Sequence, residues 1–239
     1  MIVHIYENKD QASLAAASLF CACILSKPDA VLGLATGSTP IETYQQLIDM
    51  HQSGLLDFSG CTSFNLDEYV GLSADHACSY HRFMKEQLFD HINMKKTHVP
   101  SGDAKDLLEE AGRYDKEIEA AGGIDIQFLG LGQNGHIGFN EPDSVFHYGT
   151  QIVNLTKSTI EANKRFFKAD EKVPTQAISL GAGGIMKARK IVLVALGETK
   201  AEAVRAMVTG ELDPQVQASI LRIHPDTVIL LDPQAASLL

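Results

Sequence analysis

Short apolar runs alternate with amphipathic segments along the whole 239-residue chain. The clearest run, Ile191-Val192-Leu193-Val194-Ala195-Leu196, has no polar face and suits a strand buried on both sides, as in a parallel sheet. Comparable runs predict strands at 1–6, 30–35, 62–66, 124–131, 151–155, 176–180, 190–196 and 227–231. Amphipathic patterns predict helices at 10–25, 40–51, 80–91, 107–121, 159–167, 200–208 and 216–223.

This alternation predicts an α/β fold, because parallel strands are joined by right-handed helical crossovers. We expect a doubly wound, mostly parallel, Rossmann-like sheet with helices on both faces. The chain contains no internal repeat, low-complexity tract or Pro/Gly/Ser-rich linker. A single domain over residues 1–239 is therefore expected.

Composition narrows the possible partners. Asp and Glu number 30 against 20 Lys and Arg, which gives a net charge of −10 with neutral histidine. Binding to nucleic acid is not expected, because phosphate contacts need clustered Lys and Arg, but a small anionic substrate needs only a local positive pocket.

No apolar run approaches the ~20 residues of a membrane span, and the N-terminus resembles a first strand rather than a signal peptide. The four cysteines, Cys21, Cys23, Cys61 and Cys78, lack metal-site spacing. Reduced thiols, a cytoplasmic location and no metal are expected.

Polar segments follow four of the predicted strands. Ligands of an open α/β sheet bind at the carboxyl ends of its strands, so these segments are expected to meet at one edge. They are Thr36-Gly37-Ser38-Thr39-Pro40, Asp67-Glu68-Tyr69, Gly132-Gln133-Asn134-Gly135-His136 and Gly197-Glu198-Thr199-Lys200.

The first polar segment opens a predicted helix. Pro40 suits the first helical position, and Thr39 with Glu42 forms a capping-box pattern. One interpretation is simply a well-capped helix. The other is an anion site, since Gly37 lets the backbone approach a ligand and the helix dipole favours negative charge. The segment is not a Walker A loop, because no Gly-Lys-Ser/Thr follows.

Residues 130–135 match the dinucleotide pattern G-x-G-x-x-G. That pattern requires a helix to begin within the glycines, whereas Gly138 and Pro142 would interrupt one here. NAD binding is therefore not expected, and the glycines are interpreted as shaping a loop that presents His136. A lone histidine is more often structural, but Glu141 lies close enough in sequence to set its tautomer and raise its basicity.

Four charged residues are further candidates. Asp67 and Glu68 are adjacent, so at most one should enter the site. The alternative is a turn with one solvated acid, whereas at the sheet edge Asp67 could act as a base towards a carbon acid. Arg165 and Lys200 are by default solvated helical charges. Lys200 lies near a helix N-terminus, where the dipole disfavours a cation unless an anion holds it, and Arg165 could belong to a lid over the pocket.

Six segments together resemble the glucosamine-6-phosphate deaminase family. They occur in family order over nearly the whole chain: GLATGSTP at 33–40, FNLDEYVGL at 64–72, SY at 79–80, GQNGHIGFNEP at 132–142, RFF at 165–167 and GETK at 197–200. The resemblance implies a Rossmann-like fold. It also implies conversion of glucosamine 6-phosphate and water into fructose 6-phosphate and ammonia, without a cofactor.

The resemblance implies a role for each matching residue. Asp67 would move a proton from C2 to C1 through an enediolamine. His136 would open the pyranose ring, and Glu141 would orient and charge-balance it. Many relatives have aspartate where this chain has Asn134. Because an amide supplies no charge, the ring opening would rest more on His136 and Glu141. Asn134 stays among the catalytic candidates, with two interpretations open: a part in the chemistry, or positioning of His136 by hydrogen bonding. The implied phosphate-binding residues are Thr36, Gly37, Ser38, Thr39, Arg165 and Lys200.

The resemblance also bears on regulation. Longer, hexameric relatives bind the activator N-acetylglucosamine 6-phosphate through basic side chains that follow the Asn-Glu-Pro motif, together with a C-terminal extension. Here residues 144–154 contain no Lys or Arg, Gln151 and Val153 stand at two basic positions, and the sequence stops at Leu239. We expect hyperbolic kinetics without activation, and a monomer or small homo-oligomer.

Two alternatives remain open. A sugar-phosphate lactonase of the same superfamily would share the glycine–histidine loop but lack the segments at 65–69 and 139–142. A non-catalytic sugar-phosphate sensor on this fold would carry an added DNA-binding helix pair, for which the chain has no spare length.

Overall fold

The computed structural model describes residues 1–168 and 171–239. Within them, seven strands form one sheet in the order β1-β10-β9-β6-β2-β3-β5, and every neighbouring pair is parallel. This confirms the predicted α/β fold. The strands are β1 (Ile2–Ile5), β2 (Val31–Leu34), β3 (Thr62–Asn65), β5 (Lys96–His98), β6 (Ile126–Leu129), β9 (Lys190–Ala195) and β10 (Thr227–Leu231).

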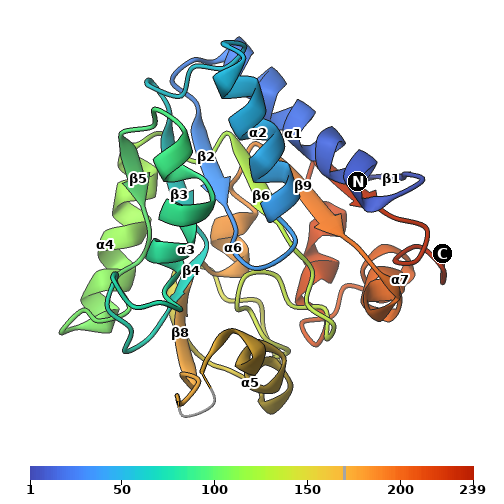
Figure 1. Ribbon diagram of the computed structural model, residues 1–239. Coiled ribbons are helices and arrows are strands. Elements are labelled where there is room, and N and C mark those ends of the chain that lie inside the picture. Colours follow the sequence, from blue (N-terminus) through green and yellow to red (C-terminus); the bar gives the residue numbers. More distant parts are fainter. Residues whose placement is uncertain (169–170) are drawn as a thin grey trace.

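Helices cover both faces of this sheet (Figure 1). The α-helices are α1 (Lys9–Ser26), α2 (Ile41–Gln52), α3 (Tyr80–Gln87), α4 (Leu107–Ala120), α5 (Lys157–Asn163), α6 (Ala182–Ile185) and α7 (Ala201–Thr209). Short 3-10 helices are η1 (Phe89–His91), η2 (Lys164–Phe166), η3 (Glu198–Lys200) and η4 (Gln217–Ile223). In the described part of the chain, no helix combines the length and apolarity needed to cross a bilayer.

Aromatic contacts show how the layers are assembled. Phe128 of β6 meets Phe20 of α1 and Tyr44 of α2, with ring centroids 6.2 and 6.3 Å away. Phe64 of β3 meets Tyr114 of α4 at 5.7 Å. The strand register places Phe64 and Phe128 on opposite faces, so α1 and α2 pack on one face and α4 packs on the other.

A second, smaller sheet lies beside the main one. It contains β4 (Asp67–Tyr69), β8 (Gln176–Ser179) and β7 (Gln151–Asn154), and both of its pairings are antiparallel. The strands at 151–155 and 176–180 were correctly predicted, but their assignment to the main sheet was wrong. The half-buried β7 and the exposed start of β8 do not fit a strand covered by helices on both faces.

Other departures from the expected elements are local. The segment after β3 is strand β4 rather than a loop, and residues 217–223 form a 3-10 helix rather than an α-helix. The expected helices at 80–91 and 159–167 each divide into an α-helix and a 3-10 turn. The sequence did not predict β5 or α6, because a three-residue edge strand and a four-residue helix carry little periodic signal.

Candidate active site

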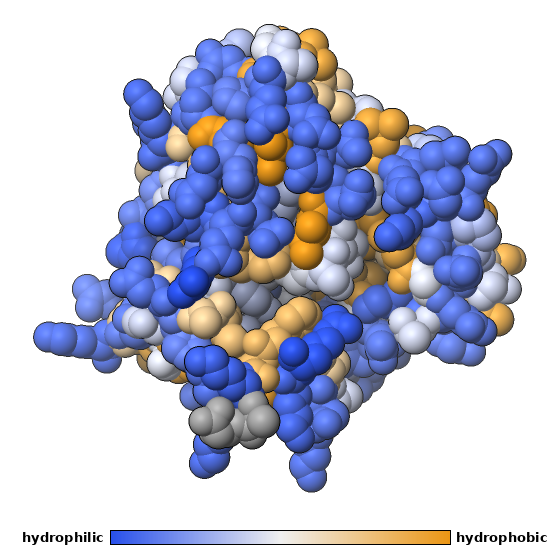
Figure 2. All heavy atoms as spheres, viewed as in Figure 1, coloured by the Kyte–Doolittle hydropathy of each residue, from blue (hydrophilic) through white to orange (hydrophobic). Residues whose placement is uncertain are grey.

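A cavity of about 650 Å³ opens at the carboxyl ends of β2, β6 and β9, beside the second sheet. The viewed face of the molecule is hollowed at its centre (Figure 2). All four polar segments expected at the sheet edge contribute to the lining, together with residues from α5 and η2. The predicted convergence of these segments is therefore confirmed. The hydrophobic pattern of the sequence did not indicate that a second sheet would form one wall of the cavity.

The loop of residues 36–39 follows β2 and leads into α2. Pro40 occupies the N-cap position with helical dihedral angles, and no side chain caps the helix. The expected capping box between Thr39 and Glu42 is therefore absent. Gly37 has φ of +93°, a conformation that side-chain-bearing residues rarely adopt. Among the described residues, no side chain accepts from the first N–H groups of α2, which directly follow the cavity-lining residues 36–39; a helix start of this kind favours an anionic ligand.

Asp67 contributes a buried carboxyl group to the cavity wall. It is only 5% exposed, and β4 pairs it with Ser179 of β8. Burial, and then the negative charge of Glu68, raise the pKa of Asp67 to about 8. The alternative interpretation of a turn with one solvated acid is wrong, because both acids lie in a strand and both are buried. Only Asp67 lines the cavity.

The glycine-rich loop after β6 presents His136, as the sequence indicated. β6 ends at Leu129, and no helix begins among the glycines that follow. A Cβ atom at Gly132 would lie 2.5 Å from the His136 ring, so only glycine lets the imidazole take this position. The loop thus places the His136 imidazole at the cavity.

Glu141 lies behind His136. Its Oε2 is 3.4 Å from His136 Nδ1 and accepts a hydrogen bond of 2.8 Å from Asn134 Nδ2. Asn134 Oδ1 in turn accepts from the His136 backbone N–H at 3.3 Å. Burial opposes ionisation of Glu141, but contacts with His136, Thr159 and Asn134 outweigh it and lower its pKa to about 2. The imidazole therefore faces the cavity with an ionised carboxylate behind it.

Arg165 of η2 and Lys200 of η3 both line the cavity. Burial, and then the charge of Arg165, lower the pKa of Lys200. Across residues 1–168 and 171–239, neither cation forms an ion pair. Gly197, in the turn before Lys200, donates its N–H to both carboxylate oxygens of Asp232 at 3.0 Å. Two cations of an acidic protein therefore lie at the same cavity.

The sequence reasoning missed the aromatic side of the cavity. Tyr80, at the first position of α3, lines the cavity and stacks on Phe139 with centroids 6.0 Å apart and planes 10° apart. Tyr80 also donates its hydroxyl to that of Tyr69 at 3.3 Å. Tyr69, Phe139 and Phe167 belong to a small apolar cluster separate from the main core. Their sequence spacing is irregular, so periodicity alone could not have grouped them.

The described cysteines are all unpaired, and Cys78 lines the cavity with its Sγ donating to the Phe166 carbonyl at 3.2 Å. Among the residues that the structure describes, no cluster of three or more His, Cys, Asp or Glu side chains has the arrangement of a metal site.

Comparison with known proteins places this arrangement in context. The family model of glucosamine-6-phosphate isomerases/6-phosphogluconolactonases matches residues 7–230. A glucosamine-6-phosphate deaminase of Thermoanaerobacter pseudethanolicus is 54% identical over 241 residues, which cover 100% of this chain and 95% of that protein. The deaminase of Alkaliphilus oremlandii is 48% identical, with 100% of both chains covered.

Solved structures agree with these sequence relationships. A structure described as a monomeric glucosamine-6-phosphate deaminase superposes with a TM-score of 0.97 at 44% identity, over 100% of both chains. A 6-phosphogluconolactonase from Trypanosoma cruzi gives a TM-score of 0.80 at 20% identity, covering 100% of this chain and 96% of that one. The second similarity concerns the fold alone.

Proposed function

Because this chain belongs to the family of glucosamine-6-phosphate isomerases and 6-phosphogluconolactonases, we infer that it is a glucosamine-6-phosphate deaminase. It converts glucosamine 6-phosphate and water into fructose 6-phosphate and ammonia, an aldose–ketose isomerisation coupled to deamination in amino-sugar breakdown. The observation that supports this function best is the sharing of one cavity by Asp67, His136, Arg165 and Lys200. These side chains provide acid–base groups for a sugar and cations for its phosphate.

The phosphate of the substrate would bind at the positive end of the cavity. Arg165 and Lys200 supply two cations, and the loop of residues 36–39 adds backbone N–H groups and hydroxyls at the uncapped start of α2. A phosphate monoester carries nearly two negative charges at neutral pH and needs such partners when it leaves water. Its charge would also relieve the repulsion between the two cations.

His136 is suited to opening the pyranose ring. Ring opening moves a proton between the anomeric hydroxyl and the ring oxygen, and imidazole exchanges protons near neutral pH. Glu141 remains ionised behind the ring and stabilises the imidazolium form. Asn134 supports this pair through its hydrogen bonds to both residues, so its role is positioning.

Asp67 is suited to the proton transfer from C2 to C1 of the opened sugar. The ionised carboxylate removes the C2 proton to form the enediolamine and returns it to C1. The resulting C2 imine is then hydrolysed, which releases ammonia and leaves the ketose. A raised pKa makes Asp67 a stronger base than an ordinary carboxylate, as removal of a proton from carbon requires.

An assay of the purified protein tests this function. Glucosamine 6-phosphate should yield ammonia and fructose 6-phosphate in equal amounts. Hydrolysis of 6-phosphogluconolactone without ammonia from the amino sugar would indicate a lactonase instead. Binding of sugar phosphate with neither reaction would indicate a sensor.

For assembly and location, we propose a monomer or small homo-oligomer in the cytoplasm that requires no nucleic acid or membrane. The solved deaminase with a TM-score of 0.97 is described as monomeric, which supports the small assembly. Light scattering of the purified protein gives the mass, and a hexamer would contradict the proposal.

A further inference from the structure

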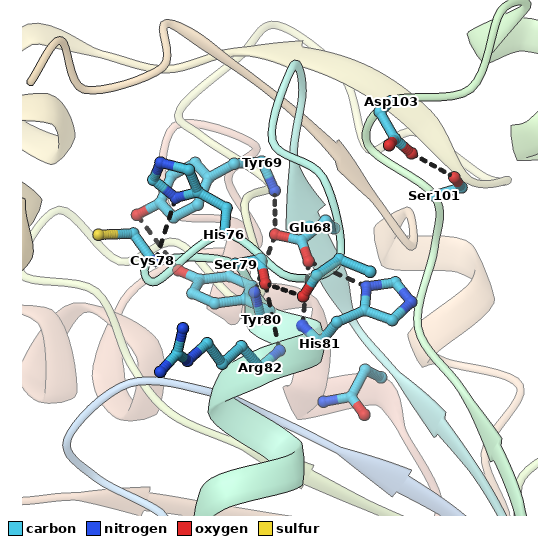
Figure 3. Close-up of polar contacts among 12 residues, drawn as sticks. Glu68, Tyr69, His76, Cys78, Ser79, Tyr80, His81, Arg82, Ser101 and Asp103 are labelled. Atoms are coloured by element: carbon cyan, nitrogen blue, oxygen red, sulfur yellow. Dashed lines mark hydrogen bonds and ion pairs between the residues drawn. The ribbon is translucent and has the colours of Figure 1, made fainter.

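Glu68 lies next to Asp67 in β4 but faces away from the cavity. Successive side chains of a strand point to opposite faces, which directs Glu68 towards the start of α3 (Figure 3). The side chain is 1% exposed and therefore has almost no contact with solvent. Burying a carboxyl group costs free energy unless hydrogen bonds or an ion pair compensate for the lost water. The hydrogen-bond partners of Glu68 therefore indicate its role.

Every partner of Glu68 offers a nitrogen. Oε1 accepts hydrogen bonds from the backbone N–H groups of Tyr69 at 2.8 Å and Tyr80 at 3.0 Å. Oε2 accepts from the backbone N–H of His81 at 3.0 Å and lies 3.1 Å from His81 Nδ1. A role as acceptor alone suits the ionised carboxylate, and the N-terminus of α3 is favourable for its charge.

We propose that Glu68 is a positioning residue for the proton transfer, fixing the start of α3 against the cavity and setting the charge environment of Asp67. This inference rests on the proposed function. Its first part follows from the contacts: Glu68 takes the N–H groups of Tyr80 and His81, while Ser79 Oγ takes that of Arg82 at 3.1 Å. With this helix start held, the Tyr80 ring is fixed on Phe139 at the cavity wall.

The second part follows from the other groups around the two acids. Burial, with a smaller contribution from the charge of Asp67, raises the pKa of four tyrosines, so they remain neutral at pH 7: Tyr44 of α2, Tyr69 of β4, Tyr80 of α3 and Tyr114 of α4. His81 of α3 faces Glu68 and also acts on Glu110 of α4. Among the described residues, the other titratable or charged side chains that line the cavity are Cys78, His136, Arg165 and Lys200. Glu68 is therefore the negative charge adjacent to Asp67.

A like charge next to a carboxyl group disfavours its ionisation. Glu68 thus works with burial to keep Asp67 a strong base, while taking no direct part in the chemistry. The strand geometry makes this possible, because adjacent residues of β4 point to opposite faces, and only the Asp67 carboxyl group lines the cavity.

The test compares the pH dependence of kcat/KM in the wild type and in Glu68→Gln. The amide removes the charge but keeps an acceptor for the Tyr69 and Tyr80 N–H groups. The midpoint of the acidic limb should fall by about one to three pH units, the range that a neighbouring charge produces. Glu110→Gln is the matched control: it neutralises another buried carboxylate, whose partners are Ser101 and Arg113, and should leave the midpoint in place. A lower kcat in Glu68→Gln with an unmoved midpoint would show a merely structural role and overturn the inference.

A second variant covers the possibility that Glu68→Gln does not fold. His81→Lys places a permanent positive charge beside Glu68 at a side chain that is 33% exposed. The midpoint should fall in the same direction, and an unmoved midpoint in this folded variant would overturn the charge role of Glu68.

Carbon-13 NMR of labelled aspartate separates this inference from the proposed function. It follows the titration of Asp67 without substrate, and Asp67→Asn assigns the signal. Wild-type protein that releases no ammonia would contradict the proposed function. A titration midpoint of Asp67 that is the same in the wild type and in the folded Glu68 or His81 variant would contradict the role of Glu68.

Discussion

Asn134 donates a hydrogen bond of 2.8 Å to Glu141, the carboxylate that lies behind His136. The amide therefore adds no second charge beside the histidine but holds the existing one in place. Its other end accepts from the His136 backbone N–H, so one side chain connects both members of the pair. We therefore expect the pair to be sensitive to substitution of Asn134.

Asn134→Ala should lower kcat/KM by roughly 10-fold or more, because a hydrogen bond to a charged group is worth about 1.5–3 kcal/mol. The pKa of Glu141 should rise with the loss of this donor, which is measurable in the pH profile. Asn154→Ala is the control, since that exposed amide bonds Gln176 on the second sheet. Equal activity of the two variants would contradict a positioning role for Asn134.

Asp67→Asn should lose activity by about 10²- to 10⁴-fold, the usual contribution of a general base. Binding of a substrate analogue should persist, because the carboxylate acts mainly in the transition state. Exchange of the C2 proton in deuterated water measures the affected step directly. Exchange at the wild-type rate in this variant would rule out Asp67 as the base.

The same substitution should stabilise the protein at neutral pH. The pKa of Asp67 is about 8 in the folded chain, above the ordinary value of 3.8. Between these values the folded state keeps a proton that the unfolded state loses, so stability falls as pH rises through this window. Asparagine removes the penalty, and Tm at pH 7 should rise by roughly 2–4 °C per kcal/mol gained. Below pH 4 the difference should vanish; a Tm that does not depend on pH in this way would contradict the raised pKa.

Lys200→Met and Arg165→Met should each weaken binding of glucosamine 6-phosphate, by roughly 10- to 100-fold for a loss of about 1.5–3 kcal/mol. Binding of unphosphorylated glucosamine should change little. Lys187→Met provides the control, because that lysine lies outside the cavity and pairs with Glu119. Variants that still favour the phosphorylated sugar as strongly as the wild type would show that neither cation binds the phosphate.

Substrate dependence should be hyperbolic and unaffected by N-acetylglucosamine 6-phosphate. Gln151, at one of the two positions expected to be basic in activated relatives, donates its amide to Asn140 Oδ1 at 3.3 Å, and the apolar side chain of Val153 offers no hydrogen bond to a phosphate. A ligand without differential affinity for two states cannot shift their balance. Sigmoidal kinetics abolished by the acetylated sugar phosphate would contradict this expectation.

The sequence predicted the structure best where burial of apolar side chains alone determines the conformation. The unbroken apolar run at 191–196 indicated a strand covered on both faces, and polar residues after such strands were expected to meet at one edge. Local sequence patterns predicted structure less reliably where tertiary contacts determine the conformation. Thr39 has the sequence context of a capping box, yet the helix starts at Ile41 without it.

The contacts of Glu68 show a further limit of sequence reasoning. Alternation along a strand separates it from Asp67, but its partners come from the start of α3, at Tyr80 and His81. Only the folded chain brings them within reach. In the same way, no local signal shows that β7 and β8 leave the main sheet to pair with β4.

The uncapped start of α2 is expected to affect how fast the protein is degraded in the cell. A side-chain cap contributes typically about 1 kcal/mol to a helix, and this helix forgoes it where substrate phosphate is expected to bind. The ligand would complete the helix, so the molecule is less resistant to unfolding while empty and gains resistance as ligand accumulates. Unfolded chains are the ones that proteases remove. The amount of enzyme would then follow the supply of amino sugar through its turnover, without any change in its synthesis.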